Sequence, residues 1–113
     1  CNVTNYNVTV TDPSGVGVFD GQAVITILNN GSCILPLTVR GVTRNLCSLY
    51  DTVNVPTCAA PDVAAFTMVE AYPTITITGI TDDGTGGAGG SFYTVAVEDA
   101  NGCLYGIDFY LQA

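Results

Sequence analysis

Two segments of this chain alternate tyrosine and valine with other residues and then reach an aspartate followed three positions later by glycine. One segment, YNVTVTDPSG, begins at Tyr6, and the other, YTVAVEDANG, begins at Tyr93. Apolar residues at every second position lie on one face of an extended strand. An Asp-x-x-Gly sequence ends such a strand, because the aspartate bonds its own backbone and the glycine accepts a positive φ. The chain is therefore expected to be built from β-strands.

The rest of the sequence repeats this alternation in short segments separated by turn residues. Residues 22–28 (QAVITIL) and 33–39 flank Asn29-Asn30-Gly31, a sequence that favours a hairpin between them. Residues 40–45 are expected to be a polar connector. Further strands are expected at 3–11, 46–55, 63–71 and 74–81 (TITITGIT), at Tyr93, and at 104–111.

Seven to nine short antiparallel strands without a long helix predict an all-β, immunoglobulin-like β-sandwich. A chain of 113 residues, 48% of them hydrophobic, can bury one core, so residues 1–113 are expected to form a single domain. Residues 63–71 fit a short helix about as well as a strand, and we favour the strand.

The charge of the chain restricts its partners. Ten acidic residues face two arginines and no lysine, for a net charge of −8. A negative surface repels phosphate backbones and anionic membranes, so nucleic acid is not an expected partner. No apolar run approaches the roughly 20 residues that span a bilayer, so membrane insertion is not expected.

Five cysteines without a Cys-x-x-Cys pair indicate disulfides formed in an oxidising compartment, outside the cell or at its surface. The odd count leaves one sulfur without a partner in the chain, and Cys1 is the expected one. The other four cysteines allow three connectivities. We favour Cys58 with Cys103 and Cys33 with Cys47. The first bridge would close a loop of about 45 residues and contribute on the order of 4 kcal/mol.

Three sequons begin at Asn2, Asn7 and Asn30. Such sites fit a glycosylated exterior and make these asparagines candidate attachment points.

Catalysis is not expected, because the chain has no histidine and no lysine. Their absence removes the commonest general base and every amine nucleophile. A glycosidase-like carboxylate pair would have to come from the acids of the expected turns, which more often bond the backbone: Asp82, Asp83, Glu98 and Asp99.

No cofactor is expected, and calcium is the remaining inorganic alternative. Asp82 with Asp83, or Asp99 with Asn101, could supply oxygen ligands, although neither loop completes a recognised calcium motif. Both arginines, Arg40 and Arg44, are expected to pair with carboxylates within the chain or on a neighbouring copy.

The segment YTVAVEDANGC resembles the closing signature of surface-adhesin repeats of gliding and other Bacteroidetes-type bacteria. The resemblance extends over about residues 56–105, with Cys58 in the place of the opening cysteine and Cys103 in that of the closing one. It implies an extracellular, noncatalytic role in adhesion or in a cell-surface appendage.

We therefore predict a structural subunit or repeat of a bacterial extracellular filament or adhesin. Residues 1–11 are expected to add as a strand to the sheet of the next copy, because an open sheet edge accepts a strand through its backbone. The residues at this joint would be Cys1, Val3, Tyr6, Val8 and Val10, with Cys1 forming an intersubunit disulfide.

The alternative is a monomeric module that binds carbohydrate or a host glycoprotein. Its ligand would contact the glycine-rich loop 82–90 and three aromatic residues near the end of the chain: Tyr105, Phe109 and Tyr110.

Overall fold

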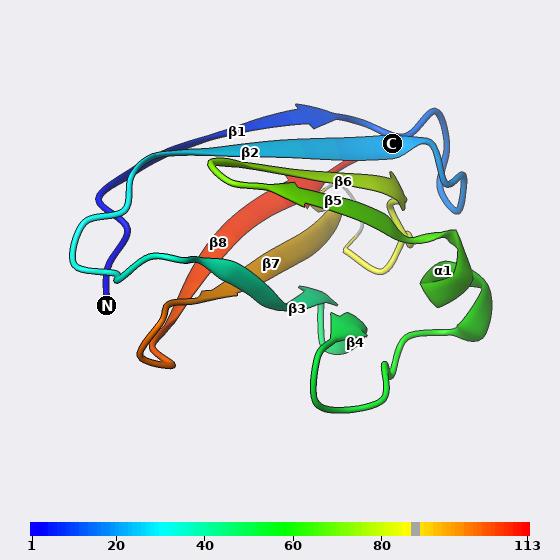
Figure 1. Cartoon of the computed structure of the whole chain (residues 1–113). Coiled ribbons are helices and arrows are strands. Elements are labelled where there is room, and N and C mark those ends of the chain that lie inside the picture. Colours follow the sequence, from blue (N-terminus) through cyan, green and yellow to red (C-terminus); the bar gives the residue numbers. More distant parts are fainter. Residues whose placement is uncertain (87–88) are drawn as a thin grey trace.

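The computed structural model describes residues 1–86 and 89–113, which form two four-stranded antiparallel sheets packed face to face (Figure 1). The first sheet has the order β1-β2-β6-β5: β1 (Asn5–Thr11), β2 (Gly21–Asn29), β6 (Thr74–Ile80) and β5 (Thr67–Ala71). The second has the order β4-β3-β7-β8: β4 (Cys47–Asp51), β3 (Thr38–Arg44), β7 (Ser91–Glu98) and β8 (Leu104–Leu111).

This strand order is that of an immunoglobulin-like sandwich. In the lettering of such domains the two sheets are A-B-E-D and C′-C-F-G. The predicted all-β class, the sandwich and its stapling by disulfides are confirmed. The single helix of the described residues, α1 (Ala60–Ala65), is far too short to cross a membrane.

The core lies between the two sheets and follows the alternation of the strands. In β7 the inward residues Tyr93, Val95 and Val97 are completely buried. Across the interface lie Ile25 of β2 and Ile77 of β6, which are also fully buried. Each such side chain contributes roughly 1.5–3 kcal/mol through burial.

The predicted hairpin between residues 22–28 and 33–39 is wrong. Both edges of β2 are already occupied, one by β1 and the other by β6. The chain does turn at Asn29–Gly31, where Asn29 Oδ1 accepts the Gly31 N–H at 2.8 Å. After this turn it crosses to the other sheet, and β3 pairs with β4 and β7. Residues 40–44, which we expected in a connector, belong to β3.

The expected strand over residues 63–71 is wrong in its first part. Helix α1 occupies residues 60–65, with Pro61 in its first turn, where proline is tolerated because its missing N–H is not needed. Strand β5 begins at Thr67 and pairs with β6.

The two termini lie at opposite ends of the sandwich in Figure 1. The molecule measures 38 × 27 × 21 Å.

Candidate functional site

The N-terminal strand lies in the sheet of its own chain. β1 pairs antiparallel with β2, from Asn5 opposite Asn29 to Thr11 opposite Gln22. Its inward residues Tyr6, Val8 and Val10 are only half-buried, and no residue of β1 is fully buried. The residues expected at an intersubunit joint therefore contact their own core, and so does Val3, which is 5% exposed.

β1 is also the outermost strand of its sheet. Its sequence, NYNVTVT, has no charged residue and no proline. Charged residues and prolines commonly protect an edge strand from pairing with other chains. The pairing of β1 with β2 shifts register between Asn5 and Tyr6 and continues without a further shift to Thr11. Most of the strand thus leaves an ordinary β edge open.

Both expected disulfides are wrong. The bonds join Cys1 to Cys33 and Cys47 to Cys58, and Cys103 is the free, exposed cysteine. Cys1 is therefore not the unpaired sulfur.

Sheet geometry explains this connectivity. The N–H groups of Thr57 and Cys58 donate to the Ser48 carbonyl oxygen at 3.0 and 2.9 Å, which brings Cys58 beside Cys47 at the edge of β4. At the N-terminal end of the sandwich, the Ser32 N–H donates to the Asn2 carbonyl oxygen at 3.1 Å and aligns the start of the chain with Cys33.

Asp99 organises the turn between β7 and β8. Its Oδ1 accepts the N–H groups of Asn101 and Cys103, and its Oδ2 accepts that of Ile34, all at 2.9 Å. The bond from Ile34 is the main cause that lowers the pKa of Asp99. The carboxylate therefore acts as a backbone clamp between this turn and the segment that holds Cys33, and Asn101 contributes its N–H to the turn.

Asp82 is engaged by the backbone in the same way. Its Oδ1 accepts the Gly84 N–H at 2.9 Å and its Oδ2 that of Ala113 at 3.0 Å. These backbone bonds, led by the one from Gly84, lower its pKa.

Asp83 accepts a bond from Asn45 Nδ2 at 2.9 Å and from the Thr85 hydroxyl at 2.7 Å. The carboxylates of Asp82 and Asp83 therefore face N–H and O–H donors and do not form a common oxygen cage. Residues 87–88 of the expected 82–90 ligand loop lie outside the described residues.

Both arginines pair with carboxylates of the same chain, which is one of the two arrangements that we expected for them. Arg44 is only 6% exposed, and it lies 2.7 Å from Asp62 Oδ2 and 3.1 Å from Asp83 Oδ2. Arg40 lies on the outer face, with Nη1 at 2.8 Å from Asp51 Oδ1 and Nε at 3.9 Å from Glu98 Oε2.

The aromatic residues proposed for ligand binding have different surroundings. Phe109 is 6% exposed and stacks on Tyr93 with ring centroids 5.1 Å apart, so it belongs to the core. Tyr105 is half-buried and meets Tyr6 edge to face. Only Tyr110 is exposed.

The candidate glycosylation sites lie near the N-terminal end and along β1. Asn2 and Asn7 are exposed. Asn30 is half-buried, and its Nδ2 donates to the Cys33 carbonyl oxygen at 2.6 Å, so its amide already supports the turn after β2. Asn7 is thus the sequon asparagine with an exposed side chain on a regular strand.

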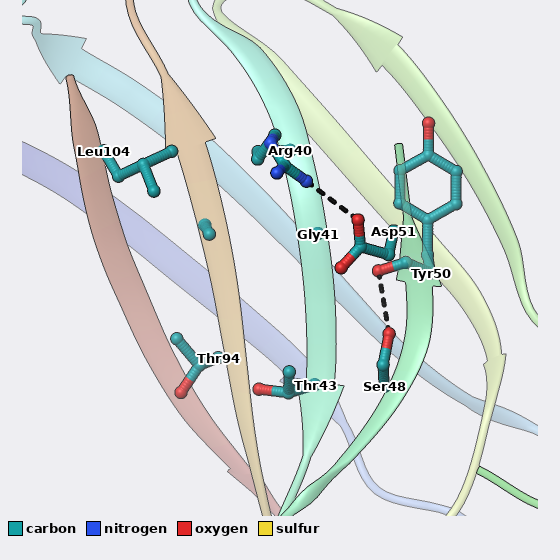
Figure 2. A pocket seen from close by; sticks show the side chains of 9 residues that line it. Arg40, Gly41, Thr43, Ser48, Tyr50, Asp51, Thr94 and Leu104 are labelled. Atoms are coloured by element: carbon teal, nitrogen blue, oxygen red, sulfur yellow. Dashed lines mark hydrogen bonds and ion pairs between the residues drawn. The ribbon is translucent and has the colours of Figure 1, made fainter. Parts of the chain in front are cut away.

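A groove of about 270 Å³ crosses the outer face of the β4-β3-β7-β8 sheet, and Figure 2 shows its lining. It is hollow because two small residues, Gly41 of β3 and Ala96 of β7, are register partners in its floor. The other lining residues come from all four strands: Arg40, Thr43, Ser48, Tyr50, Asp51, Thr94 and Leu104. This groove was not predicted from the sequence, because Gly41 lies within residues 40–45, which we expected to form a connector and not a strand. A glycine inside a strand is a signal for such a hollow.

Comparison of this chain with protein-family models, with curated proteins and with solved structures finds no match in any of the three.

Proposed function

We propose that this chain is a structural, noncatalytic module of a bacterial extracellular filament or adhesin, and that its copies join by exchange of β1. The observation that carries the proposal is the contrast between two strands of matching sequence. Tyr93, Val95 and Val97 of β7 are fully buried in the middle of a sheet, whereas the corresponding residues of β1 are half-buried at an edge. The fold can therefore give β1 to a neighbour more readily than it can give β7.

Exchange of β1 requires no new interface. When an identical element is swapped between copies, each copy receives the contacts that it made with its own strand. The connection between β1 and β2, residues 12–20, spans about 30 Å when extended. That length approaches the long dimension of the molecule, 38 Å.

The disulfide of the N-terminal segment fits the same scheme. In the closed chain Cys1 is bonded to Cys33. In an exchanged assembly Cys1 of one copy would meet Cys33 of the next, because both cysteines keep their places relative to β1 and β2. In this scheme the partner of Cys1 in the expected intersubunit disulfide is Cys33 of the next copy.

The compartment and the shape also support a surface role. Two disulfides indicate an oxidising compartment. Termini at opposite ends of the sandwich suit modules arranged in a row (Figure 1).

A mixed-isotope experiment tests the exchange. Unlabelled and isotope-labelled Cys103→Ser protein would be mixed. The disulfides would be broken with mild reductant and allowed to re-form in the mixture, and the product would then be digested without reduction. Mass spectrometry is expected to find Cys1–Cys33 peptides that join a labelled to an unlabelled copy, and negative-stain microscopy is expected to show linear assemblies.

The second disulfide is the internal control, since Cys47–Cys58 pairs should stay within one copy. A Cys33→Ser variant tests strand exchange in the absence of the Cys1–Cys33 disulfide. Its assemblies should still form, but they should dissociate in detergent without reductant. If every Cys1–Cys33 peptide carries a single label and the protein remains monomeric, exchange of β1 does not occur.

A further inference from the structure

We propose that the groove on the outer face of the β4-β3-β7-β8 sheet binds a neutral sugar residue, held by Asp51 and Arg40 and walled by Leu104. The groove is open on a face that β1 does not reach, because β1 belongs to the other sheet. The proposal is therefore independent of strand exchange.

The dimensions and lining of the groove suit a sugar ring. Its volume of about 270 Å³ exceeds that needed for a few ordered waters, since a space of roughly 10–15 Å³ on the same measure holds one water. Figure 2 shows Leu104 of β8 on one side and the Arg40–Asp51 pair on the other, with Thr43 and Thr94 along the groove. An apolar wall together with a few converging polar groups is the usual composition of a small-ligand site.

Asp51 presents a carboxylate oxygen to this space. The groups that bond it are Arg40 Nη1 at 2.8 Å, the Val53 N–H at 2.8 Å and the Asn54 N–H at 3.0 Å, and all three bond Oδ1. Among the described residues none donates to Oδ2, which is left to accept a ligand hydroxyl. The backbone bonds, led by the one from Asn54, lower the pKa of Asp51, so this acceptor is charged at neutral pH.

Arg40 supplies the complementary donors. Its Nη1 and Nε face Asp51 and Glu98, and no described residue accepts a bond from Nη2. A guanidinium donor beside a carboxylate acceptor matches neighbouring sugar hydroxyls, each of which can donate and accept. Thr43 is exposed and lines the groove, and its hydroxyl offers a further donor and acceptor.

The charge of the groove selects a neutral ligand. One guanidinium, Arg40, faces two carboxylates, Asp51 and Glu98, and the whole chain has a net charge of −8. An acidic sugar would therefore be repelled, and its carboxylate would have to compete with Asp51 for Arg40.

Heteronuclear NMR titration of the full chain tests the proposal, with methyl glycosides of glucose, galactose, mannose and N-acetylglucosamine as probes. At least one probe is expected to cause saturable amide shifts confined to β3, β4, β7 and the start of β8. Asp51→Asn retains the Oδ1 acceptor for the Val53 and Asn54 amides but removes the charge, and it should weaken binding about tenfold.

Two leucine substitutions provide a matched pair. Ala96→Leu fills the floor of the groove and should abolish binding, whereas Thr76→Leu lies on the outer face of the opposite sheet and should leave it unchanged. Thermal unfolding of both variants checks that the fold is retained. Absence of saturable shifts with all four probes, equal binding by folded Ala96→Leu protein, or tighter binding of sialic acid than of every neutral probe would each overturn the proposal.

Discussion

The Tyr93 hydroxyl donates to the Thr81 carbonyl oxygen at 2.5 Å and accepts the Thr81 N–H at 3.2 Å. Tyr93 lies near the start of β7, and Thr81 directly follows β6. This contact resembles the tyrosine corner of immunoglobulin-like domains, in which a tyrosine at the start of the F strand bonds upstream backbone, but here the bonded residue lies 12 positions before the tyrosine. This one side chain thus links the end of one sheet to the beginning of a strand in the other.

Tyr93→Phe should lower the free energy of unfolding by about 1–3 kcal/mol, because it leaves two buried backbone groups of Thr81 without a partner. Urea unfolding followed by circular dichroism measures the change. Tyr110→Phe is the matched control, since Tyr110 is exposed, and its effect should stay within about 0.5 kcal/mol. Equal effects of the two substitutions would show that the Thr81 bonds do not stabilise the fold.

The stability of the chain should fall at alkaline pH because of the same residue. Burial raises the pKa of Tyr93 to about 12, from an ordinary value of 10.0. The neutral phenol is favoured in the folded state, so its contribution is complete below pH 10 and is lost as the pH rises toward 12. Unfolding free energies of the wild type should drop by up to about 3 kcal/mol more than those of Tyr93→Phe across this window. Parallel pH profiles of the two proteins would contradict the assignment.

Arg44→Met should destabilise the fold by about 3 kcal/mol. The substitution removes the buried guanidinium between Asp62 and Asp83, so two largely buried carboxylates lose their cationic partner. Arg40→Met is the control, because the Arg40 pair is more exposed and should contribute no more than about 1 kcal/mol. Guanidinium unfolding of both variants gives the comparison, and a smaller loss for Arg44→Met than for Arg40→Met would exclude this role.

Peptide mapping without reductant should find Cys1 bonded to Cys33, Cys47 bonded to Cys58, and alkylation of Cys103 alone. Cys103→Ser should leave the free energy of unfolding within about 0.5 kcal/mol of the wild type. Cys33→Ser should lower it by about 3–4 kcal/mol, since that bridge closes a loop over a sequence separation of 32 residues. A Cys58–Cys103 peptide would instead restore the pairing that we favoured from the sequence.

Much of the fold was predictable because strand alternation and turn chemistry are local properties of the backbone. The segments at Tyr6 and Tyr93 and the Thr-Ile repeat of β6 are strands, and the Asp99 turn forms where the sequence places it. The boundary between α1 and β5 was not predictable, because five or six residues fit either period.

The β-sandwich class and the single unpaired thiol follow from residue spacing and from the odd number of cysteines, because neither property depends on distant contacts. Three features become visible only in the folded chain: β2 pairs with β1 and β6, Cys33 bonds Cys1, and Gly41 lies beside Ala96 in a groove. These outcomes depend on which distant segments pack together. That choice is made by burial in a shared core and by competition for sheet edges.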